Sequence, residues 1–191
     1  KDSTGICFIG ERPFRDFLAR YLPRTPGPIV TPEGVRVGEH MGLAYYTLGQ
    51  RQGLGIGGVQ AARDGAWFVA GKELAANRLV VVQGHDHPAL HRRDVDAVDA
   101  HWIAGTPPPM PARVAAKTRY RMPDAACTVT MDGARMRARF DAPQWAPTPG
   151  RYLVRYDGET CLGGAVIAVP AARQDRVAPR ANMDRMAASE G

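Results

Sequence analysis

The chain of 191 residues is 45% hydrophobic, enough for one ordinary core or two small ones, and its 21 glycines and 16 prolines leave few stretches for long helices. Its net charge of +6 favours a polyanionic partner, although a basic protein without such a partner would carry the same charge. No apolar run approaches the ~20 residues of a transmembrane helix, the N-terminal residues lack the features of a signal peptide, and three widely spaced cysteines argue against a disulfide framework.

Residues 1–24 are expected to form a helical remnant of a larger region, with a cysteine-bearing loop at its start. Pro13 suits the first position of a helix, and apolar side chains recur after it at helical spacing as far as Tyr21. Pro23 would end this helix. Because the chain begins with Lys1 rather than Met, inside an ordered-looking motif, we expect it to be a piece of a longer protein.

Residues 25–95 predict a small β-rich central module. Its short runs of strand-forming residues span 28–30, 43–48, 67–70 and 78–82, and glycine-bearing turns at 32–34 and 53–58 separate them. The glycine-rich stretch 53–58 is not followed by Gly-Lys-Ser/Thr and does not lead into a helix. We therefore interpret it as a hairpin or flexible loop, with a backbone contact to an RNA phosphate as the alternative.

Residues 96–170 predict a C-terminal β-barrel. Short runs, several with period-two alternation, recur at the spacing typical of small closed barrels, at 95–102, 112–118, 127–130, 136–140, 152–156 and 165–169. Residues 171–191, rich in Ala, Arg, Asp and Ser, lack apolar periodicity and are predicted to be a disordered tail. The predicted fold class is therefore mainly β, with a short helix at the start of the central module.

Cys7 is the first candidate for chemistry. It follows the small residues 3–5 and precedes the predicted helix, so backbone N–H groups could line its loop and favour a thiolate. Alternatively, residues 6–9 form a buried strand and the sulfur is a core atom. Cys127 and Cys161 lie in predicted strands, and we interpret both as core atoms. Free cysteines indicate a reducing compartment, so a cytoplasmic location is expected.

Three histidines, His85, His87 and His91, suggest a metal site. A zinc site needs three or four well-placed ligands, and neither a CxxC nor an HExxH pattern accompanies these histidines. A polar turn between strands is therefore favoured, and no metal is expected.

A basic stretch interleaves cations with an aromatic ring, at Lys117, Arg119, Tyr120 and Arg121. This pattern suits contacts to phosphates and to an unstacked base. A solvated edge strand would carry similar charges. The stretch therefore predicts either an RNA-binding surface or a charged edge of the barrel.

Several sequence blocks occur together in this chain. They are KDSTGICFIGER at 1–12 with FRDFL at 14–18, GEHMGL at 38–43, YTLGQRQGLGIGG at 46–58, KTRYR at 117–121 and CLGG at 161–164. In this order they resemble the bacterial tRNA 2-thiouridylases, the MnmA or TrmU family, over roughly residues 1–169, and the block at 46–58 is far more specific than a short motif. Two positions depart from the family pattern: Gln52 stands where a basic residue is expected, and Trp145 replaces a small residue.

The resemblance implies that a full-length enzyme replaces O2 of the wobble uridine, position 34 of certain tRNAs, with sulfur. An N-terminal PP-loop domain would adenylate this oxygen with ATP and Mg, and a persulfide relay would supply the sulfur. The residue matching Cys7 would receive or activate that sulfur, together with a partner cysteine in the N-terminal domain. The PP-loop motif and the partner cysteine are absent from this sequence, so we expect neither a cofactor in this chain nor the complete reaction from it alone.

The resemblance also assigns roles to further residues. The catalytic loop would be supported by Asp2, Ser3, Thr4 and Gly5, and tRNA would be contacted by Arg119, Tyr120 and Arg151 together with Lys117 and Arg121 of the basic stretch. The expected partners are tRNA and an upstream sulfur-relay protein or persulfide donor, with no membrane. The alternative hypothesis is a non-catalytic RNA-binding barrel. Methyl transfer, which older descriptions of the family name, has no support, since a Gly-rich strand-to-helix turn for a methyl donor is missing.

Overall fold

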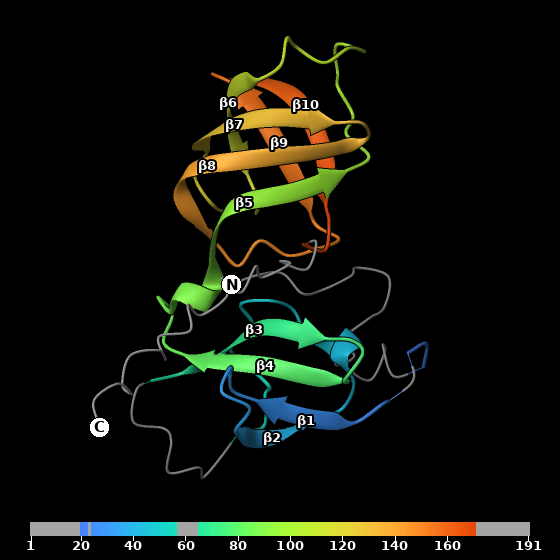
Figure 1. Cartoon of the computed structure of the whole chain (residues 1–191), viewed down its shortest axis with the longest axis vertical. Coiled ribbons are helices and arrows are strands. Elements are labelled where there is room, and N and C mark those ends of the chain that lie inside the picture. The colour runs from blue at the N-terminus through green and yellow to red at the C-terminus, as the bar shows by residue number, and fades with distance from the viewer. Residues whose placement is uncertain (1–19, 23, 57–64, 171–191) are drawn as a thin grey trace, which may run out of the picture.

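Two β units make up the described part of the chain. The computed structural model describes residues 20–22, 24–56 and 65–170, and Figure 1 shows a sheet unit at one end and a barrel at the other. The predicted mainly β fold with a closed barrel is confirmed. Within the described ranges, no helix has the length and apolar character needed to cross a membrane. The Cys7 loop, the tail and all of the predicted N-terminal helix before residue 20 lie outside the described residues, and residues 20–22 form a turn and a bend.

A four-stranded sheet forms the first unit. Its strands are β1 (Gly27–Val30), β2 (Arg36–His40), β3 (Trp67–Glu73) and β4 (Arg78–Gln83), in the spatial order β2-β1-β4-β3. β1 and β4 run parallel, with Ile29 opposite Leu79, and the other two pairs are antiparallel. Ile29, Leu79, Val69 and Val81 are fully buried, because their branched apolar side chains fill one continuous core.

The prediction of a strand at residues 43–48 is wrong. Residues Leu43–Tyr45 form the 3-10 turn η1, in which the N–H groups of Tyr45 and Tyr46 donate to carbonyl oxygens three residues earlier. Consecutive strand residues point to opposite faces, so a strand would not bury two adjacent tyrosines in one core. The turn does bury both: Tyr45 is 8% exposed and Tyr46 is 4% exposed in the same cluster.

The second unit is a closed antiparallel barrel. Its strands are β5 (His91–Val98), β6 (Ala112–Lys117), β7 (Ala125–Asp132), β8 (Arg135–Trp145), β9 (Tyr152–Asp157) and β10 (Thr160–Ile167), in the order β10-β5-β8-β7-β6-β9. The short 3-10 turn η3 (Pro88–Leu90) connects the sheet unit to the barrel. The predicted barrel edge at residue 96 falls within β5, which pairs with β8 from His91 onward.

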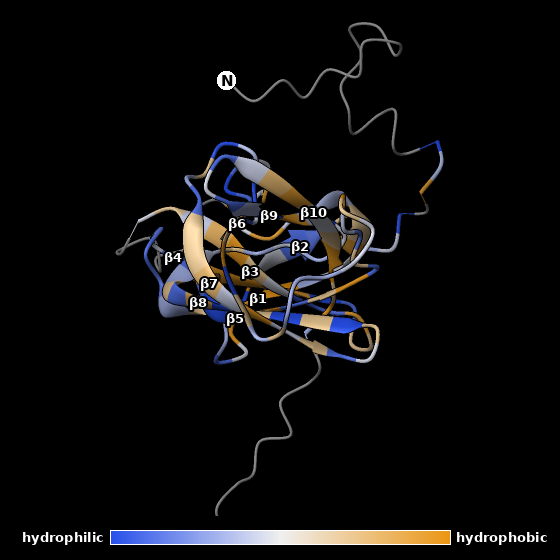
Figure 2. Cartoon of the chain, turned by 90° about the horizontal axis from the view of Figure 1, so that it is seen from above, coloured by the Kyte–Doolittle hydropathy of each residue, from blue (hydrophilic) through white to orange (hydrophobic). Residues whose placement is uncertain are grey.

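Alternation of side chains builds the barrel core. On β8, Met136, Ala138 and Phe140 are buried, whereas the intervening Arg137 and Arg139 are exposed. Figure 2 shows this alternation as hydrophilic and hydrophobic bands along the strands. Because successive strand residues point to opposite faces, β8 gives its apolar residues to the interior and its arginines to solvent.

An arginine that pairs with none of the described carboxylates lies inside the barrel. Arg155 on β9 is fully buried, and its guanidinium carbon lies 3.7 Å from the centre of the Trp102 ring. Its Nη2 donates to the carbonyl oxygens of His101 at 2.6 Å and Gly164 at 3.0 Å. Burial lowers the pKa of Arg155, but an arginine stays charged near neutral pH. Carbonyl dipoles and the indole face therefore replace water around this charge.

Gly163 on β10 allows this close packing. Its φ is +131°, and a Cβ at this position would lie 2.1 Å from the carbonyl oxygen of His101. A side chain would therefore displace the segment that accepts the hydrogen bond from Arg155. The next residue, Gly164, has room for a Cβ, since the nearest heavy atom would lie 3.6 Å away on the ring of Tyr152.

We expect Gly163→Ala to lower the free energy of unfolding by about 2 kcal/mol or more, because backbone strain and steric overlap act together. Gly164→Ala, the matched control, should change it by less than about 1 kcal/mol. Urea unfolding followed by circular dichroism measures both values. Equal stability of the two variants would contradict the packing of Gly163 against His101.

Candidate nucleic-acid interface

The end of β6 and the start of β9 meet at one edge of the barrel. These strands are antiparallel neighbours, with Lys117 opposite Val154, so residues that follow β6 lie beside residues that precede β9. Together they border a depression of about 260 Å³, which we call the barrel depression. It is lined by Lys117, Thr118, Arg119, Tyr120, Arg151, Tyr152, Val154 and Tyr156.

The barrel depression gathers most of the residues predicted to contact tRNA. Lys117, Arg119, Tyr120 and Arg151 line it, and Arg121 does not. Tyr152 and Tyr156 also line it and were not among the residues predicted from the sequence. Their signal was the alternation in β9, because Leu153 and Arg155 point into the barrel and are fully buried, so the residues between them face outward.

Two tyrosines expose their rings at this edge. Tyr120 is 94% exposed and Tyr152 is 64% exposed, both unusually high fractions for large aromatic side chains. A flat ring in this setting offers a stacking face to any unstacked base, because every base has a π-face. The tyrosines therefore present the stacking faces that the predicted contact with an unstacked base requires.

The cations of the barrel depression differ in how they are held. Nζ of Lys117 lies 2.8 Å from Oδ1 of Asp124 and 5.2 Å from the centre of the Tyr156 ring, and the hydrogen bond to Asp124 raises the pKa of Lys117. The side chain of Arg151 makes no hydrogen bond or ion pair with a described residue. Arg151 is thus the cation at this edge with the most freedom to meet a phosphate.

Arg119 connects the barrel to the sheet unit. Its Nη2 donates to the carbonyl oxygen of Leu48, 3.0 Å away in the sheet unit, and to that of Ala146, 3.2 Å away in the barrel unit. Its guanidinium carbon lies 4.6 Å from the centre of the Trp145 ring. The guanidinium is therefore engaged within the protein, and its contact with tRNA stays a prediction.

Trp145 fills the junction between the two units. Its ring stacks on His85 with centroids 4.7 Å apart and planes 11° apart, and its edge-to-face contact with Phe68 spans 6.3 Å. Its Nε1 donates to the carbonyl oxygen of His85 at 3.0 Å. A Cβ at Gly49 would lie 2.6 Å from the Trp145 ring, so this glycine lets the loop of the sheet unit approach the indole.

Two histidines of the turn between β4 and β5, and His91 at the start of β5, are hydrogen-bonded locally. His85 pairs with Asp86 at 2.9 Å, Nδ1 of His87 accepts from the N–H of Ala89 at 3.1 Å, and Nδ1 of His91 lies 3.2 Å from the carbonyl oxygen of His87. Within the described ranges, His, Cys, Asp and Glu side chains form no group of three or more that could hold a metal ion.

Each of the two β units matches a known family model. A family model described as "tRNA methyl transferase PRC-barrel domain" matches residues 15–83, which include the sheet unit. A second model, described as "Aminomethyltransferase beta-barrel domain", matches residues 92–167, which cover the barrel. Together the two matches span most of the chain.

Individual relatives carry a name that differs from both of these descriptions. Proteins named tRNA-specific 2-thiouridylase MnmA are 60% identical over 168 residues in Cupriavidus metallidurans, 61% over 168 residues in Thiobacillus denitrificans and 55% over 186 residues in Burkholderia thailandensis. The alignments cover 87%, 87% and 94% of this chain and 47%, 47% and 48% of the respective relatives. The chain belongs to the tRNA-specific 2-thiouridylase family. It carries the central and C-terminal regions of that family and spans about half the length of the curated relatives it matches.

The 2-thiouridylase family is named for chemistry at sulfur, so the cysteines are of special interest. Cys7 and the supporting residues Asp2, Ser3, Thr4 and Gly5 lie outside the described residues. Cys127 on β7 is fully buried, and loss of hydration raises the pKa of its thiol to about 11. Cys161 on β10 is exposed, contrary to the prediction that it is a core atom, because β10 presents its side chain outward.

These environments predict an order of alkylation. At pH 8 we expect iodoacetamide to modify Cys161 in the folded protein, while Cys127 reacts only after unfolding, because its thiol is buried and almost entirely protonated far below a pKa of about 11. Peptide mass spectrometry over time distinguishes the sites. Modification of Cys127 at the rate of Cys161 under native conditions would contradict the barrel core described above.

Proposed function

We propose that this chain is the tRNA-binding and cysteine-bearing half of a tRNA 2-thiouridylase. The barrel depression carries the proposal, since it joins exposed tyrosine rings to Arg151, whose side chain pairs with no described residue, on a chain of the 2-thiouridylase family. The net charge of +6 adds a general attraction to the RNA backbone.

The depression suits a single-stranded or distorted segment of tRNA better than a regular helix. Side chains do not read the deep major groove of an RNA duplex, whereas splayed bases stack on aromatic rings. Tyr120 and Tyr152 offer such rings, and Lys117 and Arg151 place positive charge beside them. The segment bound here would therefore have at least one base out of its stack.

The proposed chemistry passes through Cys7. In the full-length enzyme, ATP and Mg would bind to the N-terminal domain and activate O2 of uridine 34 as an adenylate. The terminal sulfur of a Cys7 persulfide, supplied by a relay protein or another persulfide donor, would attack C2, and the oxygen would leave with AMP. A partner cysteine of the N-terminal domain would then attack the Cys7 sulfur, which forms a disulfide and leaves the second sulfur on the base.

A non-catalytic RNA-binding barrel is the second candidate. It is favoured by one observation: the lining of the barrel depression contains phosphate-binding and stacking side chains but no cysteine. The two candidates differ in the role of Cys7, so a variant of that residue separates them.

Changes at the barrel depression should weaken tRNA binding. Tyr120→Ala is expected to raise the Kd about 5- to 150-fold, because stacking of one base contributes about 1–3 kcal/mol, whereas Tyr120→Phe should bind like the wild type. Arg151→Gln should reduce the slope of log Kd against log salt by about one phosphate contact. Filter binding at several salt concentrations measures both effects.

Arg36→Gln is the matched control for these variants. Arg36 lies on β2 in the sheet unit, is 63% exposed in its side chain and pairs with Glu39 at 2.8 Å. Its replacement removes the same charge as Arg151→Gln but leaves the barrel depression unchanged. Unaltered tRNA binding by both Tyr120→Ala and Arg151→Gln would contradict the proposed interface.

Cys7→Ser should abolish 2-thiouridine formation by the full-length enzyme supplied with ATP and a persulfide donor, while tRNA binding is retained. The hydroxyl of serine cannot carry a persulfide, so the loss should be nearly complete. Cys161→Ser, a change of an exposed thiol on the barrel, serves as the control and should leave the rate near that of the wild type. Normal thiolation of tRNA by Cys7→Ser would contradict the catalytic role of Cys7 and leave the non-catalytic RNA-binding barrel as the candidate function.

A further inference from the structure

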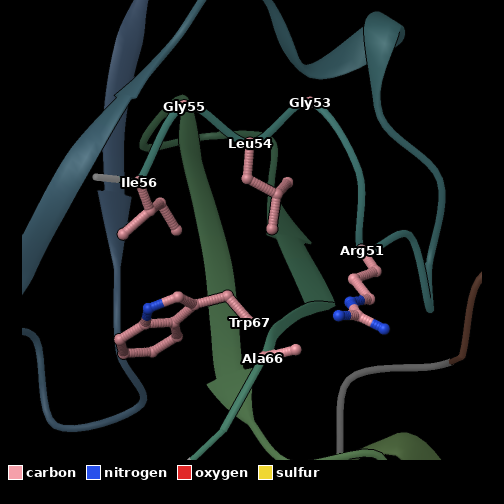
Figure 3. A pocket seen from close by; sticks show the side chains of 7 residues that line it. All are labelled: Arg51, Gly53, Leu54, Gly55, Ile56, Ala66 and Trp67. Carbon is pink, nitrogen blue, oxygen red and sulfur yellow. The ribbon is translucent and has the colours of Figure 1, made fainter. Parts of the chain in front are cut away.

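A second hollow lies on the sheet unit, away from the barrel depression. It has a volume of about 480 Å³ and is formed by the glycine-rich loop and the beginning of β3, as Figure 3 shows. Its lining consists of Arg51, Gly53, Leu54, Gly55, Ile56, Ala66 and Trp67, none of which lines the barrel depression. We call it the Arg51–Trp67 pocket.

The pocket has an apolar interior and a cation at one side. In Figure 3, Arg51 and Trp67 lie on opposite sides, with the side chain of Leu54 between them and Ile56 above the indole. Leu54 is only 4% exposed and packs in the core of the sheet unit, so this wall is fixed. The volume lies within the about 300–1,000 Å³ typical of small-ligand sites.

The backbone holds Arg51 and Trp67 in a defined relation. The N–H of Gly49 donates to the carbonyl oxygen of Val69 at 2.8 Å, and the N–H of Val69 donates to that of Gln50 at 3.0 Å. These two bonds attach the residues before Arg51 to β3, the strand that starts at Trp67. The side chain of Gln50 also donates to the carbonyl oxygen of Gln52 at 2.9 Å, which braces the loop on both sides of Arg51.

Arg51 is available for a ligand. Its side chain is exposed and has no hydrogen-bond or ion-pair partner among the described residues. A Cβ at Gly55, whose φ is +66°, would meet no atom of a described residue within 4 Å. None of the lining residues is acidic. The site therefore presents positive charge next to a flat apolar surface.

These features match the two parts of a nucleotide. A base could lie against the indole of Trp67, since aromatic stacking accepts any base, and a phosphate would match the fork of an arginine. We propose that the Arg51–Trp67 pocket binds one nucleotide of the RNA, with its base on Trp67 and its phosphate at Arg51. This inference rests on the proposed function in one respect, namely that the partner is tRNA.

The two RNA sites share one loop. The carbonyl oxygen of Leu48, three residues before Arg51, accepts the hydrogen bond from Arg119, which lines the barrel depression. The same tRNA could therefore contact both units, and the junction would fix the separation of its two contacts.

Arg51→Gln tests the proposal directly, because Arg51 is exposed and its replacement leaves the core of the sheet unit intact. We expect the Kd for tRNA to rise about tenfold, with a lower salt slope, because one charge-assisted contact to phosphate is lost. The effect should persist in the Tyr120→Ala background, because the two sites are separate. Arg36→Gln, which removes an equal charge from the same unit, should bind like the wild type.

Trp67 supplies an independent readout. Saturating tRNA should quench tryptophan fluorescence, and the quenched component should be missing from Trp67→Phe, which keeps an aromatic ring in the same wall. Polyglutamate of similar charge should cause no quenching, and neither should uridine monophosphate at the same nucleotide concentration. Equal quenching by polyglutamate would indicate an acidic-peptide site, and quenching by uridine monophosphate without tRNA would indicate a free-nucleotide site; either result would overturn the proposal.

The outcomes also separate this inference from the proposed function. Normal affinity of Arg51→Gln together with weak binding by Tyr120→Ala would overturn the pocket and leave the barrel depression in place. Weak tRNA binding by Arg51→Gln together with normal binding by Tyr120→Ala and Arg151→Gln would overturn the barrel depression as an RNA interface and leave the pocket in place. Equal losses of tRNA affinity in Arg51→Gln and Arg36→Gln would show that only the net charge matters. This result would overturn the pocket. A wild-type chain that binds no tRNA would overturn both.

Discussion

Two barrel residues join the two β units: Arg119, which hydrogen-bonds to the sheet unit, and Trp145, whose ring packs on His85 and Phe68. One guanidinium group donates to the carbonyl oxygens of Leu48 in the sheet unit and Ala146 in the barrel unit, and it lies over the indole. Bonds from a charged donor in a partly buried setting are stronger than neutral ones. Under the proposals above, this junction would hold the barrel depression and the Arg51–Trp67 pocket in place for one RNA ligand.

The barrel itself depends on a second arginine with a different role. Arg155 is fully buried and is satisfied by carbonyl oxygens and the Trp102 ring. Gly163 lets the segment that supplies one of these oxygens come close. Arg119 and Arg155 thus stabilise the fold through the same planar fork that suits phosphate, whereas the exposed side chains of Arg51 and Arg151 pair with no described residue. The number of arginines in this chain therefore does not indicate how many of them contact RNA.

The family match and the arrangement of the described side chains both support the proposed function, in which binding and sulfur delivery belong to different parts of the chain. Relatives twice as long carry the same central and C-terminal regions and are named for 2-thiouridine synthesis. The described residues supply stacking faces and cations, which are binding groups. Under the proposed function, the barrel and the sheet unit would hold the tRNA while the Cys7 loop delivers sulfur to it. Trp145, which the sequence resemblance predicts to be a departure from the family pattern, fills this junction with a large ring.

The sequence by itself determined the mainly β fold, the barrel and the basic, aromatic character of residues 117–121, because period-two alternation and local composition are properties of neighbouring residues. It failed at 43–48, where the burial of adjacent tyrosines required a turn, and it placed Cys161 inside the barrel. Only the tertiary structure decided that Arg151 lies beside Tyr120, that Arg119 spans two units, and that Arg51 faces Trp67. Those relations depend on strand order and loop contacts between distant segments, which no local pattern encodes.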